Sequence, residues 1–246
     1  MKLLDSQGES LSFHQVLLKA APRYLEQFGQ TMPRRHRQVL ERILRCRTPE
    51  MGGHLFACPA CRIQHFRCHS CNDRHCPQCG GSEGQQWLAK QRERLLFNTP
   101  YALITFTLPD PLRTWMRSHQ RWGYPMLFEC SWQAMRELAA NPKRLGGELG
   151  ALGVLQTWSR TLIYHPHVHY LLPHGALSAD QRVWVESKSP KYLLPFTPLA
   201  DRFRNLFLQR LREADPDFSD RLPKSVWKNH WVVDVRCVGN GDHALA

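Results

Sequence analysis

The 246-residue sequence lacks any apolar run close to the roughly 20 residues that a membrane-spanning helix requires. Its first residues turn polar before a secretory signal sequence is formed, which predicts a cytoplasmic protein that is not bound to a membrane. The chain also has no internal repeat beyond its cysteine pairs, no low-complexity linker and no glycine-rich phosphate loop. Strands separated by helices without such a loop favour an α+β fold, in which helices pack on a sheet.

Acidic residues are scarce relative to basic ones. The sequence has 21 Asp and Glu against 33 Lys and Arg, which gives a net charge of +12. This excess favours a polyanionic partner, because Lys and Arg contact phosphates and release their counterions. DNA or RNA is therefore the expected partner, with an ordinary basic protein as the simpler alternative. Hydrophobic residues make up 42% of the chain, enough to build a core.

Seven of the nine cysteines fall between Cys46 and Cys79, and in a reducing compartment such clustering indicates metal ligands more than disulfides. Two Cys-Pro-x-Cys knuckles, Cys58/Cys61 and Cys76/Cys79, have nearly the spacing of a four-cysteine zinc site. Two thiolates separated by two residues can hold one ion through a tight turn, and two such turns complete a tetrahedron. We therefore predict a structural Zn²⁺ held by these four residues, with redox chemistry or a disulfide framework as the alternative.

The remaining ligands suffice for a second zinc. The favoured set is Cys46, Cys71 and His75 with either His54 or His69, although spacing does not choose among the permutations. Each single histidine is equally well explained as a surface residue. The arginines predicted to bind DNA beside this module are Arg34, Arg35, Arg37 and Arg74. A purely structural module is the alternative.

We expect two domains, a helical and zinc-binding DNA-recognition domain at 1–98 and an α+β domain at 99–246. Apolar periodicity predicts helices over 11–45, 85–97, 111–118, 126–140 and 199–211. Alternation predicts strands over 101–108, 154–158, 166–172 and 231–238, with a turn at Gly175 and a returning arm at 183–185.

Three histidines stand at every second position, His165, His167 and His169, so in a strand they share one face. Neutral imidazoles in this arrangement can hold a divalent ion with open positions for a phosphate oxygen. A hydrogen-bonded polar strip is the alternative. The neighbouring Tyr164 and Tyr170 have odd spacing from the histidines, which directs them to the opposite face.

These motifs together resemble the two-tyrosine rolling-circle transposases of bacterial insertion sequences, a family of the HUH nuclease class with an N-terminal zinc-binding domain. The matching pieces are Cys46-Arg-Thr48, the knuckles through Cys79, Ile104-Thr-Phe-Thr-Leu108, Leu155-Gln-Thr-Trp158 and His165-Pro-His-Val-His169. The resemblance implies an HUH-type antiparallel sheet with helices packed on it. It also implies Mg²⁺ or Mn²⁺ at His167 and His169, with His165 as an adjunct and Gln156 as a candidate third ligand.

The family attacks DNA with a tyrosine pair on a helix downstream of the sheet, whereas no tyrosine follows Tyr192 here. We therefore expect a truncated transposase that binds metal and DNA, as single strands or hairpin ends, but does not cleave by the tyrosine route. Two alternatives remain open. One is a histidine-triad nucleotide hydrolase, which also has alternating histidines, and the other is a non-catalytic, zinc-dependent nucleic-acid-binding protein.

Overall fold

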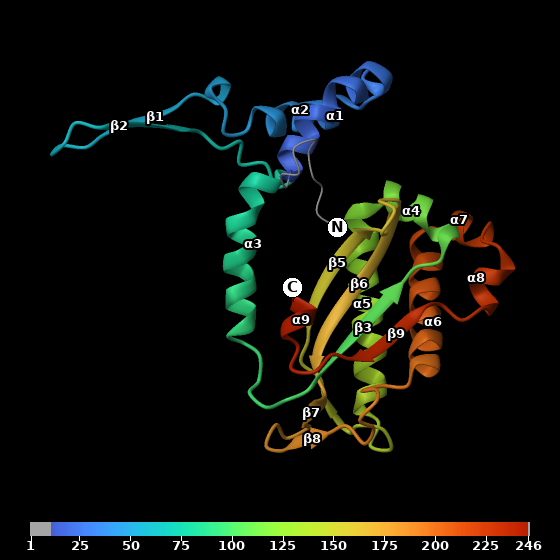
Figure 1. Ribbon diagram of the computed structural model, residues 1–246. Coiled ribbons are helices and arrows are strands. Elements are labelled where there is room, and N and C mark those ends of the chain that lie inside the picture. The colour runs from blue at the N-terminus through green and yellow to red at the C-terminus, as the bar shows by residue number, and fades with distance from the viewer. Residues whose placement is uncertain (1–10, 246) are drawn as a thin grey trace. The chain divides into compact units, whose positions relative to one another are not determined.

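The computed structural model describes residues 11–245, in which the chain forms two compact units that divide between Gln91 and Arg92 (Figure 1). The boundary predicted after residue 98 lies a few residues further along the chain. Each unit has its own buried cluster, small in the first unit and large in the second.

The first unit contains helices α1 (Phe13–Phe28), α2 (Arg34–Arg45) and α3 (Pro77–Arg92), a short 3₁₀ turn (Pro49–Met51) and the hairpin of β1 (Gly53–Ala57) and β2 (Gln64–Cys68). The stretch 11–45, expected to be helical, forms two helices. They are separate because α1 ends at Phe28 with Gly29 as its C-cap, and Pro33, which lacks a backbone N–H, precedes α2. The helix expected over 85–97 instead begins at Pro77 and ends at Arg92.

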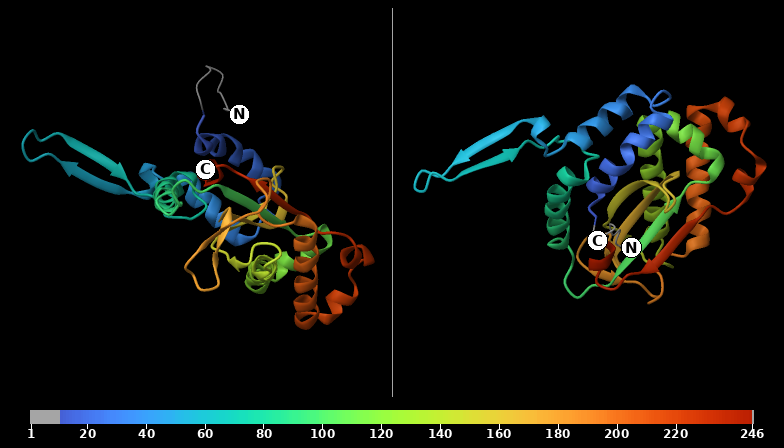
Figure 2. Two further views of the ribbon diagram at one scale, coloured as in Figure 1. Left: turned by 90° about the horizontal axis from the view of Figure 1, so that it is seen from below. Right: turned by 45° about the horizontal axis from the view of Figure 1, so that its top comes forward.

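The β1–β2 hairpin extends away from the helices of its own unit, as both views of Figure 2 show. Its strands pair in antiparallel register from Gly53 opposite Cys68 to Ala57 opposite Gln64. Almost all of its side chains are exposed. A two-stranded hairpin of this kind is marginally stable in isolation.

The second unit is built on a four-stranded antiparallel sheet of order β5-β6-β3-β9, which confirms the α+β prediction. The strands are β3 (Tyr101–Thr107), β5 (Leu152–Trp158), β6 (Tyr164–Pro173) and β9 (Val233–Cys237). Helices α4 (Arg113–Ser118), α5 (Gln120–Ala140) and α6 (Phe196–Ala214) lie along one face (Figure 1). A 3₁₀ turn (Asp110–Leu112) and the short helices α7 (Pro216–Asp220), α8 (Lys224–Lys228) and α9 (Asp242–Leu245) complete the unit.

The hydrophobic core lies between this sheet and its helices. Alternation along β3 buries Ile104 and Phe106, and the Phe106 ring lies 4.9 Å from Phe203 of α6 and 5.9 Å from Tyr170 of β6, between ring centroids. Thr105 and Thr107 therefore point to the opposite face. One face of the sheet is thus fixed by packing, and the other is left to polar side chains.

A second, small sheet has the order β4-β7-β8, formed by β4 (Gly147–Glu148), β7 (Gly175–Ser178) and β8 (Trp184–Glu186). The turn predicted at Gly175 is wrong, because this glycine is the first residue of β7 and the turn follows that strand. A Cβ atom there would approach Trp184 of the neighbouring strand to 2.4 Å, so the position requires glycine for a close contact. Within residues 11–245, no helix is both long enough and apolar enough to cross a membrane.

Candidate metal centres

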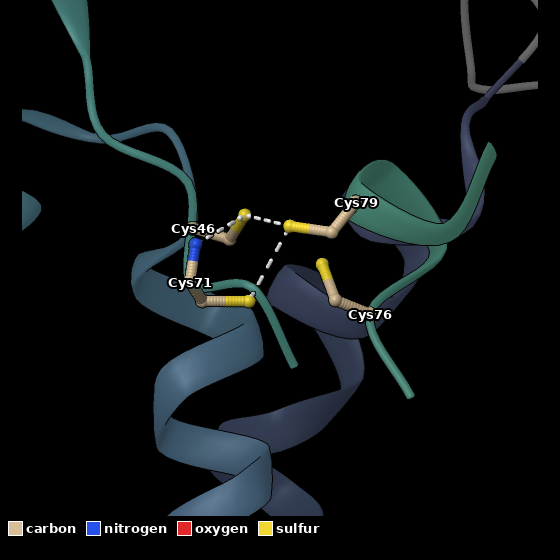
Figure 3. A group of neighbouring side chains, drawn as sticks. All are labelled: Cys46, Cys71, Cys76 and Cys79. Carbon is tan, nitrogen blue, oxygen red and sulfur yellow. Dashed lines mark hydrogen bonds between the residues drawn. The ribbon is translucent and has the colours of Figure 1, made fainter. Parts of the chain in front are cut away.

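Four cysteines of the first unit converge on one point: Cys46, Cys71, Cys76 and Cys79 (Figure 3). Their sulfur atoms all lie within 4.8 Å of one another, with Cys46 to Cys79 at 3.4 Å and Cys71 to Cys79 at 3.7 Å. Sulfur atoms at the corners of a zinc tetrahedron are separated by about 3.8 Å, given a Zn–S bond of about 2.3 Å. The four residues present therefore fit a structural Zn²⁺.

The ends of helices α2 and α3 and the loop between the hairpin and α3 position these four thiols. Cys46 caps the C-terminus of α2, and the Cys71 backbone N–H donates to its sulfur over 3.4 Å. Cys76 precedes α3, whereas Cys79 lies in its first turn, where Pro77 is compatible with a helix start. The small core of the unit forms around them, with Ile43 buried and Leu17, Val39 and Met51 packed against it. The cysteines of the metal site are therefore also part of the small hydrophobic core of this unit.

The pKa values of two of these thiols, Cys71 and Cys79, are shifted in opposite directions. Burial raises the pKa of Cys71 to about 12. Burial also acts to raise the pKa of Cys79, but hydrogen bonds from the Cys46 thiol and the Asn72 backbone lower it to about 7. Zinc binds the thiolate forms, so metal binding must release protons from the buried thiols and becomes weaker in acid.

The grouping expected from spacing differs from this one. Cys76 and Cys79 join Cys46 and Cys71, whereas Cys58 and Cys61 lie at the closed end of the hairpin. The reason is geometric. Each five-residue strand rises about 3.3 Å per residue, so the hairpin holds Cys58 and Cys61 away from the other four cysteines. Spacing alone does not reveal that the residues after Ala57 form the far end of a hairpin.

The second zinc set predicted above is not assembled. His75 is exposed, and its ring lies near the Arg74 guanidinium, 3.4 Å from Nε to Nε2. His54 is exposed at the base of the hairpin and packs edge-on against His69, 4.5 Å between ring centroids. Neither histidine belongs to the group of Cys46, Cys71, Cys76 and Cys79, which we call the cysteine quartet.

The hairpin knuckle has a preformed turn of its own. Backbone and side-chain hydrogen bonds from Cys61, with a further backbone bond from Ala60, lower the pKa of the exposed Cys58. Burial has little influence there, so the backbone turn itself favours the thiolate.

The alternating histidines lie on β6, a central strand of the large sheet, on the face opposite the packed helices. His167 is 8% exposed, and its ring centroid lies 4.7 Å from that of His169 and 5.2 Å from that of His165. As expected, Tyr164 and Tyr170 point to the helical side. The Tyr164 hydroxyl bonds to that of Tyr124, and the Tyr170 hydroxyl bonds to that of Ser131.

Hydrogen bonds distinguish the three imidazoles. His167 Nδ1 lies 2.6 Å from the His165 carbonyl oxygen. A carbonyl only accepts, so Nδ1 carries the proton and Nε2 keeps a lone pair for a metal. His165 Nδ1 instead accepts from the Arg113 guanidinium over 2.5 Å, because arginine only donates. The lone pair of His165 is thereby occupied.

His169 and Gln156 meet across the β5–β6 pair. Gln156 stands opposite His167 in the register, and its Oε1 lies 3.2 Å from His169 Nε2. Thr105 of β3 contacts the other nitrogen, with 2.8 Å between Oγ1 and His169 Nδ1. Because an amide oxygen only accepts, His169 Nε2 donates to Gln156 in this arrangement and Nδ1 accepts from the Thr105 hydroxyl. The threonine hydroxyl can also accept, so it can equally orient the other tautomer of His169, in which Nε2 has its lone pair for a metal. Sequence alternation places Thr105 on this face but does not give its partner.

The environment favours the neutral forms of His165 and His169. Burial lowers the pKa of His169, and the neighbouring His167 lowers it further. Burial also lowers the pKa of His165, followed by the positive charge of Arg113. Neutral imidazole is the form that binds metal. Arg113, which sequence analysis missed, also pairs with Asp110, with Nη2 to Oδ1 at 2.6 Å.

A cavity of about 270 Å³ adjoins His165 at the end of β3. Leu108, Pro109, Val226 and Trp231 line it with apolar surface, and polar groups are supplied by residues including Asp110, Asn229 and His230. An apolar cleft with a few polar groups suits a small ligand.

The arginines predicted to bind DNA lie on the first unit. Arg34 and Arg35 are exposed on the first turn of α2, and Arg74 is exposed in the loop before α3. Arg37 differs, because its guanidinium donates to the Gly29 carbonyl and ties α2 to the end of α1. A positioning role therefore accounts for Arg37 within this unit.

These features define a zinc-binding module followed by an antiparallel sheet with a histidine strand. A family model described as "Transposase zinc-binding domain" matches residues 16–108, and one described as "Putative transposase" matches residues 150–246. No solved structure matches the chain.

Two curated relatives show the same similarity. The "Putative transposase y4qJ" of Sinorhizobium fredii is 39% identical over 178 residues, which cover 72% of this chain and 44% of that protein. The "Transposase for insertion sequence element IS801" of Pseudomonas savastanoi pv. phaseolicola is 34% identical over 150 residues, covering 60% of this chain and 35% of that protein. The chain thus matches less than half the length of these relatives.

The chain belongs to the IS91-type insertion-sequence transposases with an N-terminal zinc-binding domain. This membership sets aside the histidine-triad hydrolase that the alternating histidines alone also permit.

Proposed function

We propose that the second unit holds a divalent cation, Mg²⁺ or Mn²⁺, at His167 and His169, and presents it to a DNA phosphate. The observation that carries the proposal is the convergence of His169 and Gln156 beside His167 on the open face of the sheet. When bound, such an ion polarises the phosphate for attack. Gln156 supplies the third ligand, and Thr105 orients His169.

His165 has a different role in this proposal. Its Nδ1 accepts from Arg113, so Nε2 carries a proton and can donate to a phosphate oxygen. The Arg113 guanidinium adds positive charge to the same edge of the strand. The adjacent 270 Å³ cavity is large enough for an unpaired base. These features support a single strand or hairpin end as the substrate, because a paired base is not free to enter a cavity.

Strand cleavage through a protein-DNA link requires a hydroxyl nucleophile that reaches the phosphorus in line. Tyr164 and Tyr170 do not qualify, since their hydroxyls bond to groups on the helical side of the sheet. Burial also raises the pKa of Tyr170 to about 12, which disfavours the phenolate. We therefore propose that the histidine strand supplies metal binding and DNA positioning, and that neither of its neighbouring tyrosines supplies the nucleophile.

Fluorescence anisotropy with labelled DNA tests this function. Single-stranded, hairpin and duplex oligonucleotides of one sequence are titrated with the chain, with and without Mn²⁺. We expect single strands and hairpins to bind more tightly than duplex, and Mn²⁺ to strengthen that binding. The strengthening should disappear in the His167→Ala/His169→Ala double variant and persist in His243→Ala, an exposed histidine of the same unit that does not line the cavity. Equal binding of duplex and single strand, unaffected by Mn²⁺, would contradict the proposal.

A further inference from the structure

The hairpin knuckle Cys58-Pro-Ala-Cys61 is a metal-binding turn that the cysteine quartet leaves unused. The Cys58 backbone N–H donates to the Ile63 carbonyl, and the Arg62 N–H donates to the Cys58 carbonyl, both over 2.9 Å. These bonds close the hairpin and hold both thiols at its end, where they are exposed. Hydrogen bonds from Cys61 and Ala60 to the Cys58 side chain complete the turn. Backbone donors of this kind support thiolate ligands of metals.

The knuckle provides only half of a zinc site. A structural zinc takes four ligands, as a rule. Among residues 11–245, no third His, Cys, Asp or Glu gathers with Cys58 and Cys61 into a ligand group. The closest strand histidine, His65, pairs with Phe56, so it stands diagonal to Cys58, at roughly 7 to 8 Å between Cα atoms. Two further ligands are therefore needed to complete such a site.

Within residues 11–245, the surface around the knuckle is also left open. Four large apolar side chains on the hairpin are half-exposed or more: Leu55, Phe56, Ile63 and Phe66. The two strands pair only with each other among the described residues, so both outer edges present open backbone groups. The β1–β2 hairpin thus has an apolar surface, open edges and two thiols at its end. These features suit it to pair with the same hairpin of a second copy.

We propose that two copies of this chain join through their hairpin ends, with one Zn²⁺ bound by Cys58 and Cys61 of each copy. A two-fold axis through the ion brings identical surfaces together and completes a four-cysteine tetrahedron from two identical halves. Ile63 pairs with Cys58 across the hairpin and lies beside this contact, where association buries it. The quartet zinc stays within each copy.

Zinc content and molar mass test the proposal on the full chain, purified with a non-chelating reductant. We expect about 1.5 zinc per wild-type chain, one from the quartet and half from the shared site, together with a dimer by sedimentation. The Cys58→Ser/Cys61→Ser variant should lose about 0.5 zinc per chain and become a monomer, with unchanged circular dichroism. Cys68→Ser is the matched control, a hairpin cysteine outside both sites, and should keep the wild-type zinc and mass.

Three outcomes overturn the shared site. The first is a monomer with one zinc per wild-type chain. The second is a monomer with two, since each hairpin then completes its own site. The third is a dimer that survives the double serine variant. Co²⁺ substitution gives an independent readout, because the ion lost with Cys58 and Cys61 should show the intense charge-transfer absorption of four sulfur ligands. A spectrum of two sulfurs and two nitrogens contradicts the proposal.

Discussion

At the scale of residues, the hydrogen bond at one ring nitrogen decides what the other can do. His165, His167 and His169 are equivalent in the sequence pattern, but Arg113 occupies the lone pair of His165 and a carbonyl leaves that of His167 available. The spacing of the three histidines predicted that they share one face of the strand. Their different hydrogen bonds were not predictable, because Arg113 is 52 positions away in the chain and meets His165 only in the folded unit.

Thr105 tests the idea that a neighbouring hydroxyl orients a metal ligand. Thr105→Val keeps the shape of the side chain but removes the contact with His169 Nδ1. We expect Mn²⁺ affinity to fall by about tenfold or more, without loss of folding. Thr107→Val is the control, since Thr107 faces His167 in the register while His167 Nδ1 bonds to a carbonyl. Calorimetric titration measures both, and equal affinities for the two variants would remove Thr105 from the account.

The lowered pKa values of His165 and His169 predict a pH dependence of stability. As pH falls through the ordinary value near 6.5, the unfolded chain takes up protons before the folded one, so these groups make the unit less stable in acid. Their contribution is present above pH 6.5 and is lost below it. Metal-free protein should therefore show a lower urea midpoint at pH 5.5 than at pH 7.5.

The matched comparison is His165→Asn/His169→Asn, which should reduce that difference in midpoint, whereas His230→Asn at an exposed position should not. A double variant with the same midpoint shift as wild type would show that other groups cause it.

At the scale of elements, the zinc module depends on its quartet more than on its core. Only Ile43 and three cysteines are buried in this cluster, so metal binding must replace much of the missing hydrophobic stabilisation. The strands and helices of the second unit were predicted well, because packing on a large core requires a regular spacing of apolar residues. This spacing is every second residue in β3 and β6 and follows the helical period in α6. The first unit was predicted less well, since cysteine spacing does not determine which pairs a hairpin brings together.

Cys76→Ser tests this dependence. Structural zinc contributes on the order of 10 kcal/mol in small modules, so losing one buried ligand should unfold residues 11–91 while the second unit keeps its cooperative transition. Cys58→Ser is the control and should leave both transitions in place. Differential scanning calorimetry with zinc analysis measures the result. A Cys76→Ser protein that melts like wild type would contradict zinc at the quartet.

At the scale of the whole molecule, the net charge of +12 predicts salt-dependent DNA binding. About six phosphate contacts on a single strand imply an affinity loss on the order of 100-fold or more between 50 and 200 mM salt. Arg34→Ala/Arg35→Ala should reduce the slope of log affinity against log salt by about 1.4, whereas Arg182→Ala, at an exposed loop, should leave it unchanged. Salt titration of anisotropy provides the slopes, and a flat dependence would argue against phosphate contacts.

The most direct test of the central claim is Mn²⁺ binding followed by electron paramagnetic resonance on the full chain. We predict one site that accepts Mn²⁺ at neutral pH, is weakened in Gln156→Ala, and is lost in His167→Ala/His169→Ala. His230→Ala should bind as wild type does. Mn²⁺ binding of undiminished affinity in the double histidine variant would contradict the assignment of the metal to the histidine strand.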